Sequence, residues 1–134
     1  MNAELVHYIL WISFLLSALS DPLCDLYSST NIASFSTGWN CSGSTPLSPV
    51  CKNATATTWS NIKCYNGAVV QISFSNVFEI TGTIPSSIGQ IRSLQYLGFN
   101  NNLMSGSIPT SIGLISSLIG LYLTNNAFIG SRPT

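Results

Sequence analysis

The chain has 134 residues, no formal net charge and only 6% charged side chains, although 46% of its residues are hydrophobic. This length corresponds to one domain, and the charged fraction is far below the roughly 25% of typical soluble domains. Four Lys and Arg residues are too few for the basic surface that dominates nucleic-acid affinity, which excludes nucleic acid as a partner. Ser, Thr and Asn make up about a third of the chain, and this neutral polar composition favours an extracellular module over a cytosolic enzyme.

Residues 1–20 contain an apolar run from Leu5 to Leu19, followed by Ser20 and Asp21-Pro22. The run is shorter than the roughly 20 apolar residues of a transmembrane helix and predicts a secretory signal peptide, cleaved before Asp21. The alternative is an uncleaved membrane anchor, because Glu4 lies in the head region and no basic side chain does. We therefore expect a secreted or extracellular protein, membrane-anchored if this segment is retained.

Beyond residue 20 the chain has no histidine, since His7 is the only one, and its acids are Asp21, Asp25 and Glu79. Without His there is no Ser-His-Asp or Cys-His arrangement and no imidazole metal ligand. Asp21 and Asp25, four residues apart, could place two carboxylates on one helix face as in a glycosidase. The favoured interpretation is that Asp21 caps a short helix and Asp25 stabilises its first turn. We predict no enzymatic activity, no cofactor and no bound metal.

Four cysteines lie in the first half of the chain: Cys24, Cys41, Cys51 and Cys64. An even number behind a secretory signal predicts two disulfides, whereas zinc is disfavoured by the absence of a C-x-x-C pair. Of three possible pairings, we predict Cys24 with Cys41 and Cys51 with Cys64. Two sequons, at Asn40 and Asn53, are candidate glycosylation sites.

A repeat with a period of 24 residues is the strongest pattern in the sequence. Residues 81–89 (TGTIPSSIG) recur at 105–113 (SGSIPTSIG), and the offset continues from Leu94 to Leu118 and from Asn102 to Asn126. Such a period is typical of stacked structural repeats.

Residues 94–109 resemble the plant-type leucine-rich repeat, whose motif is LxxLxLxxNxLSGxIP. The segments 25–31, 39–41 and 59–64 resemble the cysteine-bearing amino-terminal cap of that family, although residues 52–58 lengthen the usual spacing between the last two cysteines. The resemblance implies an α/β solenoid, a short right-handed coil with a parallel β-sheet on its concave face and a disulfide-stabilised N-terminal cap. We expect the cap at 21–66 and about 2.5 repeats at 67–134, with no C-terminal cap.

Each repeat also has a physical interpretation of its own. Leu97 and Phe99, like Leu121 and Leu123, alternate as inward positions of a short strand. The ladder residues Asn102 and Asn126 are expected to be buried, with their amides bonded to backbone groups of their own and the neighbouring turn. The aliphatic residues that follow at three-residue spacing predict a one-turn 3₁₀ segment: Ile112, Ile115 and Leu118. The first repeat carries one extra residue between Phe74 and Ile80, which we expect a β-bulge at the cap junction to absorb.

Outward strand positions are the candidate ligand-binding residues, because solenoids bind through extended concave faces. The predicted ligand-binding residues are Gln71, Ser73, Ser75, Tyr96, Asn100, Tyr122 and Thr124, and Asn101 and Asn125 are also expected to point outward. This neutral surface suits a peptide, protein or carbohydrate ligand. The alternative is a merely solvated face. Trp39 and Trp59 could be stacking platforms for a ligand, but we expect them to cover the end of the core.

Two functions follow from these expectations. The first is a non-enzymatic extracellular binding module, as the receptor ectodomains and wall-protein inhibitors of the family imply. The alternative is a truncated fragment of a larger receptor-like leucine-rich-repeat protein without independent activity, because the uncapped end would leave apolar side chains uncovered. Self-association or a partner at that end could also cover them.

Overall fold

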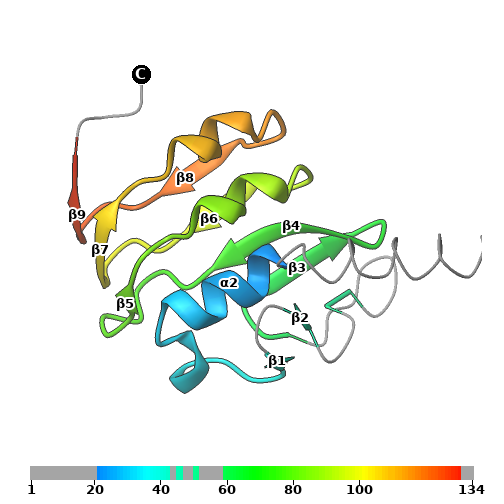
Figure 1. Cartoon of the computed structure of the whole chain (residues 1–134), viewed down its shortest axis with the longest axis horizontal. Coiled ribbons are helices and arrows are strands. Elements are labelled where there is room, and N and C mark those ends of the chain that lie inside the picture. Colours follow the sequence, from blue (N-terminus) through cyan, green and yellow to red (C-terminus); the bar gives the residue numbers. More distant parts are fainter. Residues whose placement is uncertain (1–20, 43–44, 47–49, 52–58, 131–134) are drawn as a thin grey trace, which may run out of the picture.

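The computed structural model describes residues 21–42, 45–46, 50–51 and 59–130 (Figure 1). The predicted signal peptide, the Asn53 sequon and the inserted segment 52–58 lie outside these residues. Where the chain is described, it holds no helix that is both long and apolar enough to cross a bilayer.

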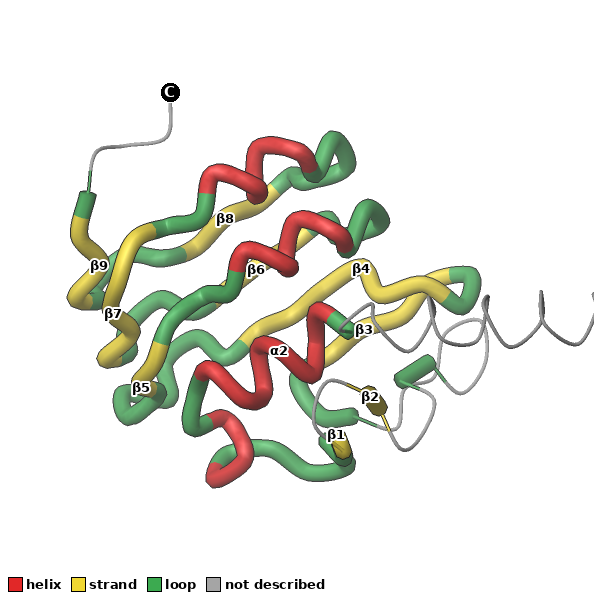
Figure 2. The backbone as a smooth tube through the Cα atoms, in the orientation of Figure 1, coloured by secondary structure: helices red, strands yellow, loops and turns green. Residues whose placement is uncertain are grey.

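The described chain forms stacked coils with a row of helical segments on one side and a row of strands on the other (Figure 2). The helical row consists of α2 (Pro22–Ser29), η2 (Ser86–Gln90) and η3 (Thr110–Leu114), where η denotes a 3₁₀ helix. A further short segment, η1 (Ile32–Ser34), follows α2. The order along the row matches the order along the chain, so each coil adds to the one before it.

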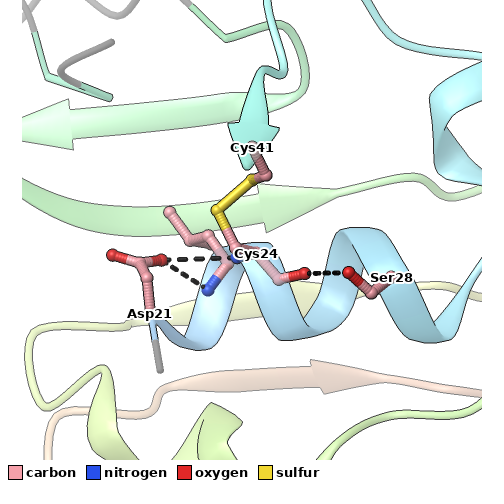
Figure 3. Close-up of a disulfide and its surroundings, with 5 residues drawn as sticks. Asp21, Cys24, Ser28 and Cys41 are labelled. Atoms are coloured by element: carbon pink, nitrogen blue, oxygen red, sulfur yellow. Dashed lines mark hydrogen bonds between the residues drawn. A yellow bond between two sulfur atoms is a disulfide. The ribbon is translucent and has the colours of Figure 1, made fainter. Parts of the chain in front are cut away.

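Helix α2 begins because Asp21 caps it. The Asp21 carboxylate accepts hydrogen bonds from the Leu23 amide at 2.8 Å and the Cys24 amide at 3.4 Å (Figure 3). Pro22 occupies the first turn. Such a cap satisfies amides that have no partner within the helix and contributes about 1 kcal/mol. The predicted helix-capping role of Asp21 and the first-turn position of Asp25 are confirmed.

Two disulfides hold the amino-terminal part together. Cys24 in α2 pairs with Cys41 in β1 (Cys41–Ser42), and Cys51 pairs with Cys64 in β3 (Ile62–Tyr65), as predicted. Strand β1 also pairs antiparallel with β2 (Thr45–Pro46). The first disulfide joins the helical row to the segment beside it, as Figure 3 shows.

The main sheet has the order β3-β4-β6-β8, formed by β3, β4 (Ala68–Ser73), β6 (Tyr96–Gly98) and β8 (Gly120–Tyr122). Strands β3 and β4 are antiparallel, whereas β4, β6 and β8 are parallel. The parallel register pairs Ile72 with Leu97 and Leu97 with Leu121. The hairpin turn between β3 and β4 spans the predicted boundary between the cap and the repeats at residues 66 and 67.

A second sheet follows the turns and has the order β5 (Thr81–Gly82), β7 (Leu103–Ser107) and β9 (Ala127–Ile129). Its first strand contacts the end of α2, because the Thr83 amide donates to the Ser29 carbonyl at 3.0 Å. Gly82 lies in the left-handed region, with φ 104°, and a Cβ there would lie 2.1 Å from the Ser29 carbonyl oxygen. Only glycine fits this junction.

The predicted 3₁₀ segment is confirmed as η3, and its counterpart η2 lies one repeat earlier. Ile112 within η3 and Ile115 at its end are buried, and Leu118 is half-buried. Both segments begin directly after a proline, Pro85 or Pro109, whose extended backbone starts the turn.

One apolar core runs through the cap and the repeats. Trp39 and Trp59 are buried with ring centroids 4.7 Å apart, and Trp39 contacts Phe74, which stacks on Phe99 at 5.7 Å. The prediction that both tryptophans cover the core is therefore confirmed. Leu97 and Phe99 are fully buried, whereas Leu121 is 39% exposed, because no described coil covers β8.

The bulge predicted at the cap junction does not hold the extra residue of the first repeat. The pairing of β4 with β6 is regular, with an offset of 25 residues between Gln71 and Tyr96. The additional residue lies in the turn after β4, where Asn76 and Phe78 both have positive φ, 62° and 70°. A turn absorbs it because backbone at a turn is not tied to a strand partner on both sides. A register shift does occur at the cap junction, between Lys63 and Cys64 of the antiparallel hairpin.

Candidate functional site

The outer face of the main sheet carries two rows of side chains. One row consists of Gln71, Tyr96 and Gly120, which are register partners on successive strands. The other consists of Ser73, Gly98 and Tyr122. Because register partners in a sheet share a face, the predicted binding residues of β4, β6 and β8 are brought onto one surface. We call this surface the strand face.

Each tyrosine on the strand face lies beside a glycine of the adjacent strand, Tyr96 beside Gly120 and Tyr122 beside Gly98. Both glycines are buried although their positions face outward. A Cβ at Gly120 would lie 2.8 Å from Tyr96 Cδ1 and 2.7 Å from Tyr122 Cε2. The two rings therefore cover Gly120 and occupy the space that a side chain would need.

A hollow of about 130 Å³ opens between these side chains. Its lining brings together four of the predicted residues with the backbone of the sheet: Gln71, Ile72, Ser73, Tyr96, Gly98 and Tyr122. The other three predicted residues, Ser75, Asn100 and Thr124, do not line the hollow. They follow the strands at the turn, where Ser75 and Asn100 are half-buried and Thr124 is exposed.

Sequence reasoning missed Lys63 as a neighbour of the strand face. Lys63 is exposed on β3 and is the register partner of Gln71, so its side chain borders the same surface. Recognising it required the pairing of β3 with β4, because the repeat pattern begins only after the hairpin. The described part of β4, β6 and β8 carries no Asp, Glu, Lys or Arg.

The two ladder asparagines bond to the backbone of neighbouring coils. Asn102, 5% exposed, donates to the Phe74 and Phe99 carbonyls at 2.8 and 2.9 Å and accepts from the Ile80 amide at 3.3 Å. Asn126 donates to Phe99 at 2.8 Å and accepts from the Met104 amide at 2.9 Å. These bonds satisfy backbone groups between the two sheets, so the ladder is structural.

A second asparagine ladder runs along the turns. Asn125 donates to the Asn101 side chain, which donates to that of Asn76, and all three residues have φ between 56° and 62°. Asn101 and Asn125 are therefore engaged with the protein itself, although the sequence favoured outward, ligand-facing roles. The sequence signal for this ladder is an asparagine at the equivalent position of three repeats. Asparagine is a residue type that tolerates positive φ.

The remaining candidate residues have structural explanations or lie outside the strand face. The Asp21 carboxylate is bonded to the first turn of α2. Within the described ranges, His, Cys, Asp and Glu form no group of three that could hold a metal ion. The sequon residue Asn40 is exposed, next to Cys41 of the first disulfide.

No family model matches the sequence, and no curated protein matches it. Among solved structures, the chain is similar to the crystal structure of PEPR1-AtPEP1, with a TM-score of 0.59 and 25% identity over 81% of this chain. The chain spans 15% of the length of that neighbour. The crystal structure of the BIR3-SERK2 complex from Arabidopsis thaliana has 22% identity and a TM-score of 0.47, over 79% of this chain and 69% of that one.

The likeness to PEPR1-AtPEP1, the parallel sheets and the two disulfides support a small leucine-rich-repeat-like fold of the kind found in plant receptor ectodomains. In this fold the strand face presents outward side chains in register.

Proposed function

We propose that the protein is a non-enzymatic extracellular binding module whose strand face recognises a peptide, protein or glycan. The observation that carries this proposal is the hollow on the strand face, where Tyr96 and Tyr122 are presented beside Gln71 and Ser73. Aromatic rings with a few polar groups around a concavity are typical of ligand sites. The likeness to the crystal structure of PEPR1-AtPEP1 is consistent with such a role.

The test uses the full chain, expressed through a secretory pathway and screened against arrays of peptides and glycans. A triple variant, Gln71→Ala, Ser73→Ala and Tyr122→Ala, removes three side chains from the strand face. We expect every true ligand to lose about tenfold or more in affinity, because the side chains at the centre of an interface dominate binding. A matched triple variant away from the strand face, at Gln90 of η2, Thr110 of η3 and Ser116 just after η3, replaces three exposed side chains by Ala and should leave affinity unchanged. Ligands that bind the first triple variant with the same affinity as the parent chain would contradict the proposal.

We further propose that residues 1–20 direct secretion and that Asn40 carries a glycan. Support comes from the two disulfides, which persist in oxidising compartments, and from the exposure of Asn40. The intact mass of the secreted product, with and without enzymatic deglycosylation, reports leader removal, glycan number and thiol state together. A mass that retains the leader would support the membrane-anchored alternative.

A second candidate function is that of a segment within a larger right-handed leucine-rich-repeat solenoid. It is favoured by the apolar side chains that β8, β9 and the adjacent turn expose, with Ile119 69%, Leu121 39% and Ile129 71% exposed. Another coil or a second copy of the chain could bury them. Sedimentation of the purified chain distinguishes the candidates: a monomer that binds a ligand supports the independent module, whereas concentration-dependent association supports the segment.

A further inference from the structure

The tyrosine pair of the strand face has no role in the core. Neither Tyr96 nor Tyr122 belongs to the apolar core, and Tyr122 is 52% exposed. Among the described residues, neither ring is stacked on another aromatic ring and neither hydroxyl has a recorded hydrogen-bond partner. Packing therefore does not account for two aromatic rings set side by side on the sheet.

The glycines determine how these rings are presented. Gly98 and Gly120 are the register neighbours of Tyr122 and Tyr96, and both rings extend over Gly120. Because no Cβ lies beneath them, the rings rest close to the backbone and leave a shallow hollow beside them instead of standing upright. This hollow of about 130 Å³ is smaller than the roughly 300–1,000 Å³ pockets that enclose drug-sized ligands. Its volume suits one ring of a larger molecule that lies across the strand face.

The groups around the rings are neutral and can both donate and accept hydrogen bonds. Gln71 is the register partner of Tyr96, and Ser73 lies across Gly98 from Tyr122. An amide and a hydroxyl can each bond to an alcohol in either direction. Charged ligand groups would lose hydration on β4, β6 and β8 without finding an opposite charge, because the described part of these strands has no acidic or basic side chain. The nearest cation, Lys63, borders the face from β3.

These features match the chemistry of a neutral sugar ring. A pyranose presents a face of C–H groups that packs on the electron-rich face of an aromatic ring, and its hydroxyls project sideways toward amides and hydroxyls. A proline-rich peptide also packs on aromatic rings, but it offers mainly carbonyl acceptors and leaves the acceptor capacity of Gln71 and Ser73 unused. The balance of donors and acceptors therefore favours the sugar.

We propose that Tyr96 and Tyr122, set over Gly120 and beside Gly98, form a subsite for one neutral pyranose ring of an oligosaccharide, with Gln71 and Ser73 bonding to its hydroxyls. The inference rests on the proposed binding role of the strand face and names its ligand class. The two tyrosines stack on the sugar ring, and Gln71 and Ser73 fix the orientation of the sugar.

The test measures binding of the full chain by calorimetry or NMR titration with five probes: cellohexaose, xylohexaose, mannohexaose, hexagalacturonate and decaproline. At least one neutral hexasaccharide should bind, and Tyr122→Ala and Gly120→Ala should each weaken it about tenfold or more. Gly120→Ala acts by displacing both rings. Gly113→Ala is the matched control, because a Cβ at Gly113 meets no atom within 4 Å, and it should bind as the parent chain does. The circular dichroism spectrum of each variant verifies its fold, and Tyr122→Ala serves if Gly120→Ala does not fold.

The outcomes separate this inference from the proposed function. If no neutral hexasaccharide binds, or if neutral binding survives Tyr122→Ala, the sugar subsite is wrong. If decaproline binds instead and loses affinity in the same variants, the subsite serves a peptide, and the binding role of the strand face stands. If ligands found on the arrays bind independently of every strand-face variant, both proposals fail.

Discussion

Asparagine has two separate roles in this chain, and the groups to which the side chains bond distinguish them. Asn102 is buried and bonds to main-chain groups of its own coil and the preceding one. Asn76, Asn101 and Asn125 instead bond to one another along the surface and adopt positive φ. In the first role, asparagine supplies the hydrogen-bond partners that buried backbone groups require. In the second, it stabilises a turn with positive φ, a conformation that costs most other residues conformational energy.

Replacing Asn102 by Ala should lower the free energy of unfolding by about 2–6 kcal/mol. The Phe74 carbonyl and the Ile80 amide would lose their bonds to this side chain, whereas the Phe99 carbonyl keeps its bond from Asn126. Each buried group left unsatisfied costs about 1–3 kcal/mol. Urea unfolding of the purified chain measures the change.

Asn100→Ala is the control for that experiment. Its side chain makes only an exposed bond of 3.5 Å to Asn76, so the loss should be within about 0.5 kcal/mol. Equal effects at the two positions would show that the buried ladder contributes no more than a surface amide.

At the scale of elements, the junction between α2 and β5 places the first coil against the cap. Thr30 and Gly82 form a β-bridge, and Asn31 donates to the Glu79 carbonyl and accepts from the Thr81 amide. The end of α2 thus takes the place that a preceding repeat would occupy beside β5. The close approach at Gly82 sets how near the cap can lie.

Gly82→Ala should destabilise the protein far more than Gly130→Ala. Both glycines have similar backbone angles, φ 104° and 110°, but a Cβ at Gly130 meets no atom within 4 Å. Gly130→Ala therefore costs only backbone strain of about 1–3 kcal/mol. In Gly82→Ala the new Cβ would in addition overlap the backbone of Ser29, which cannot move without separating α2 from β5. Thermal unfolding followed by circular dichroism compares the two, and equal melting temperatures would contradict the tight junction.

Much at this scale was predictable because the 24-residue period fixes equivalent positions once one coil is understood. The structure has the predicted parallel register of Leu97 with Leu121 and the predicted 3₁₀ segment before Ile115. Both disulfide pairings, which lie in the cap and outside the repeat, are also as predicted. The turn conformation at Phe78 was not predictable, because an extra residue can be absorbed wherever backbone is least constrained. The position of Lys63 beside Gln71 depends on a hairpin outside the repeat, and the hollow depends on where two tyrosine rings settle over a glycine.

At the scale of the whole molecule, the cap and the repeats share one core. The aromatic contacts lead from Tyr27 through Trp39 to Phe74 and Phe99 without a break at the predicted boundary. Strands β3 and β4 pair across that boundary as well. Such continuity makes separate unfolding of the two parts unfavourable, since either part alone would expose apolar surface.

We therefore expect the described chain to unfold in a single cooperative transition. Tryptophan fluorescence reports on the cap through Trp39 and Trp59, and far-ultraviolet circular dichroism reports on the strands of the repeats. The two probes should give the same urea midpoint, as two-state behaviour requires. Two separate midpoints would show that residues 21–66 and 67–134 are independent units.

The side-chain hydrogen bonds between successive repeats run mostly in one direction along the chain. Asn126, Ser117 and Ser111 each bond to the coil before their own, and Asn102 and Ser93 do the same one repeat earlier. A coil therefore brings with it the groups that attach it, and among the side-chain bonds that join one described repeat to another, only that from Arg92 to the Leu114 carbonyl points forward. Duplication or deletion of one 24-residue unit in the gene would leave the attachments of all earlier coils in place. Repeat number can thus change in evolution by whole units, at little cost to the part of the molecule that is already folded.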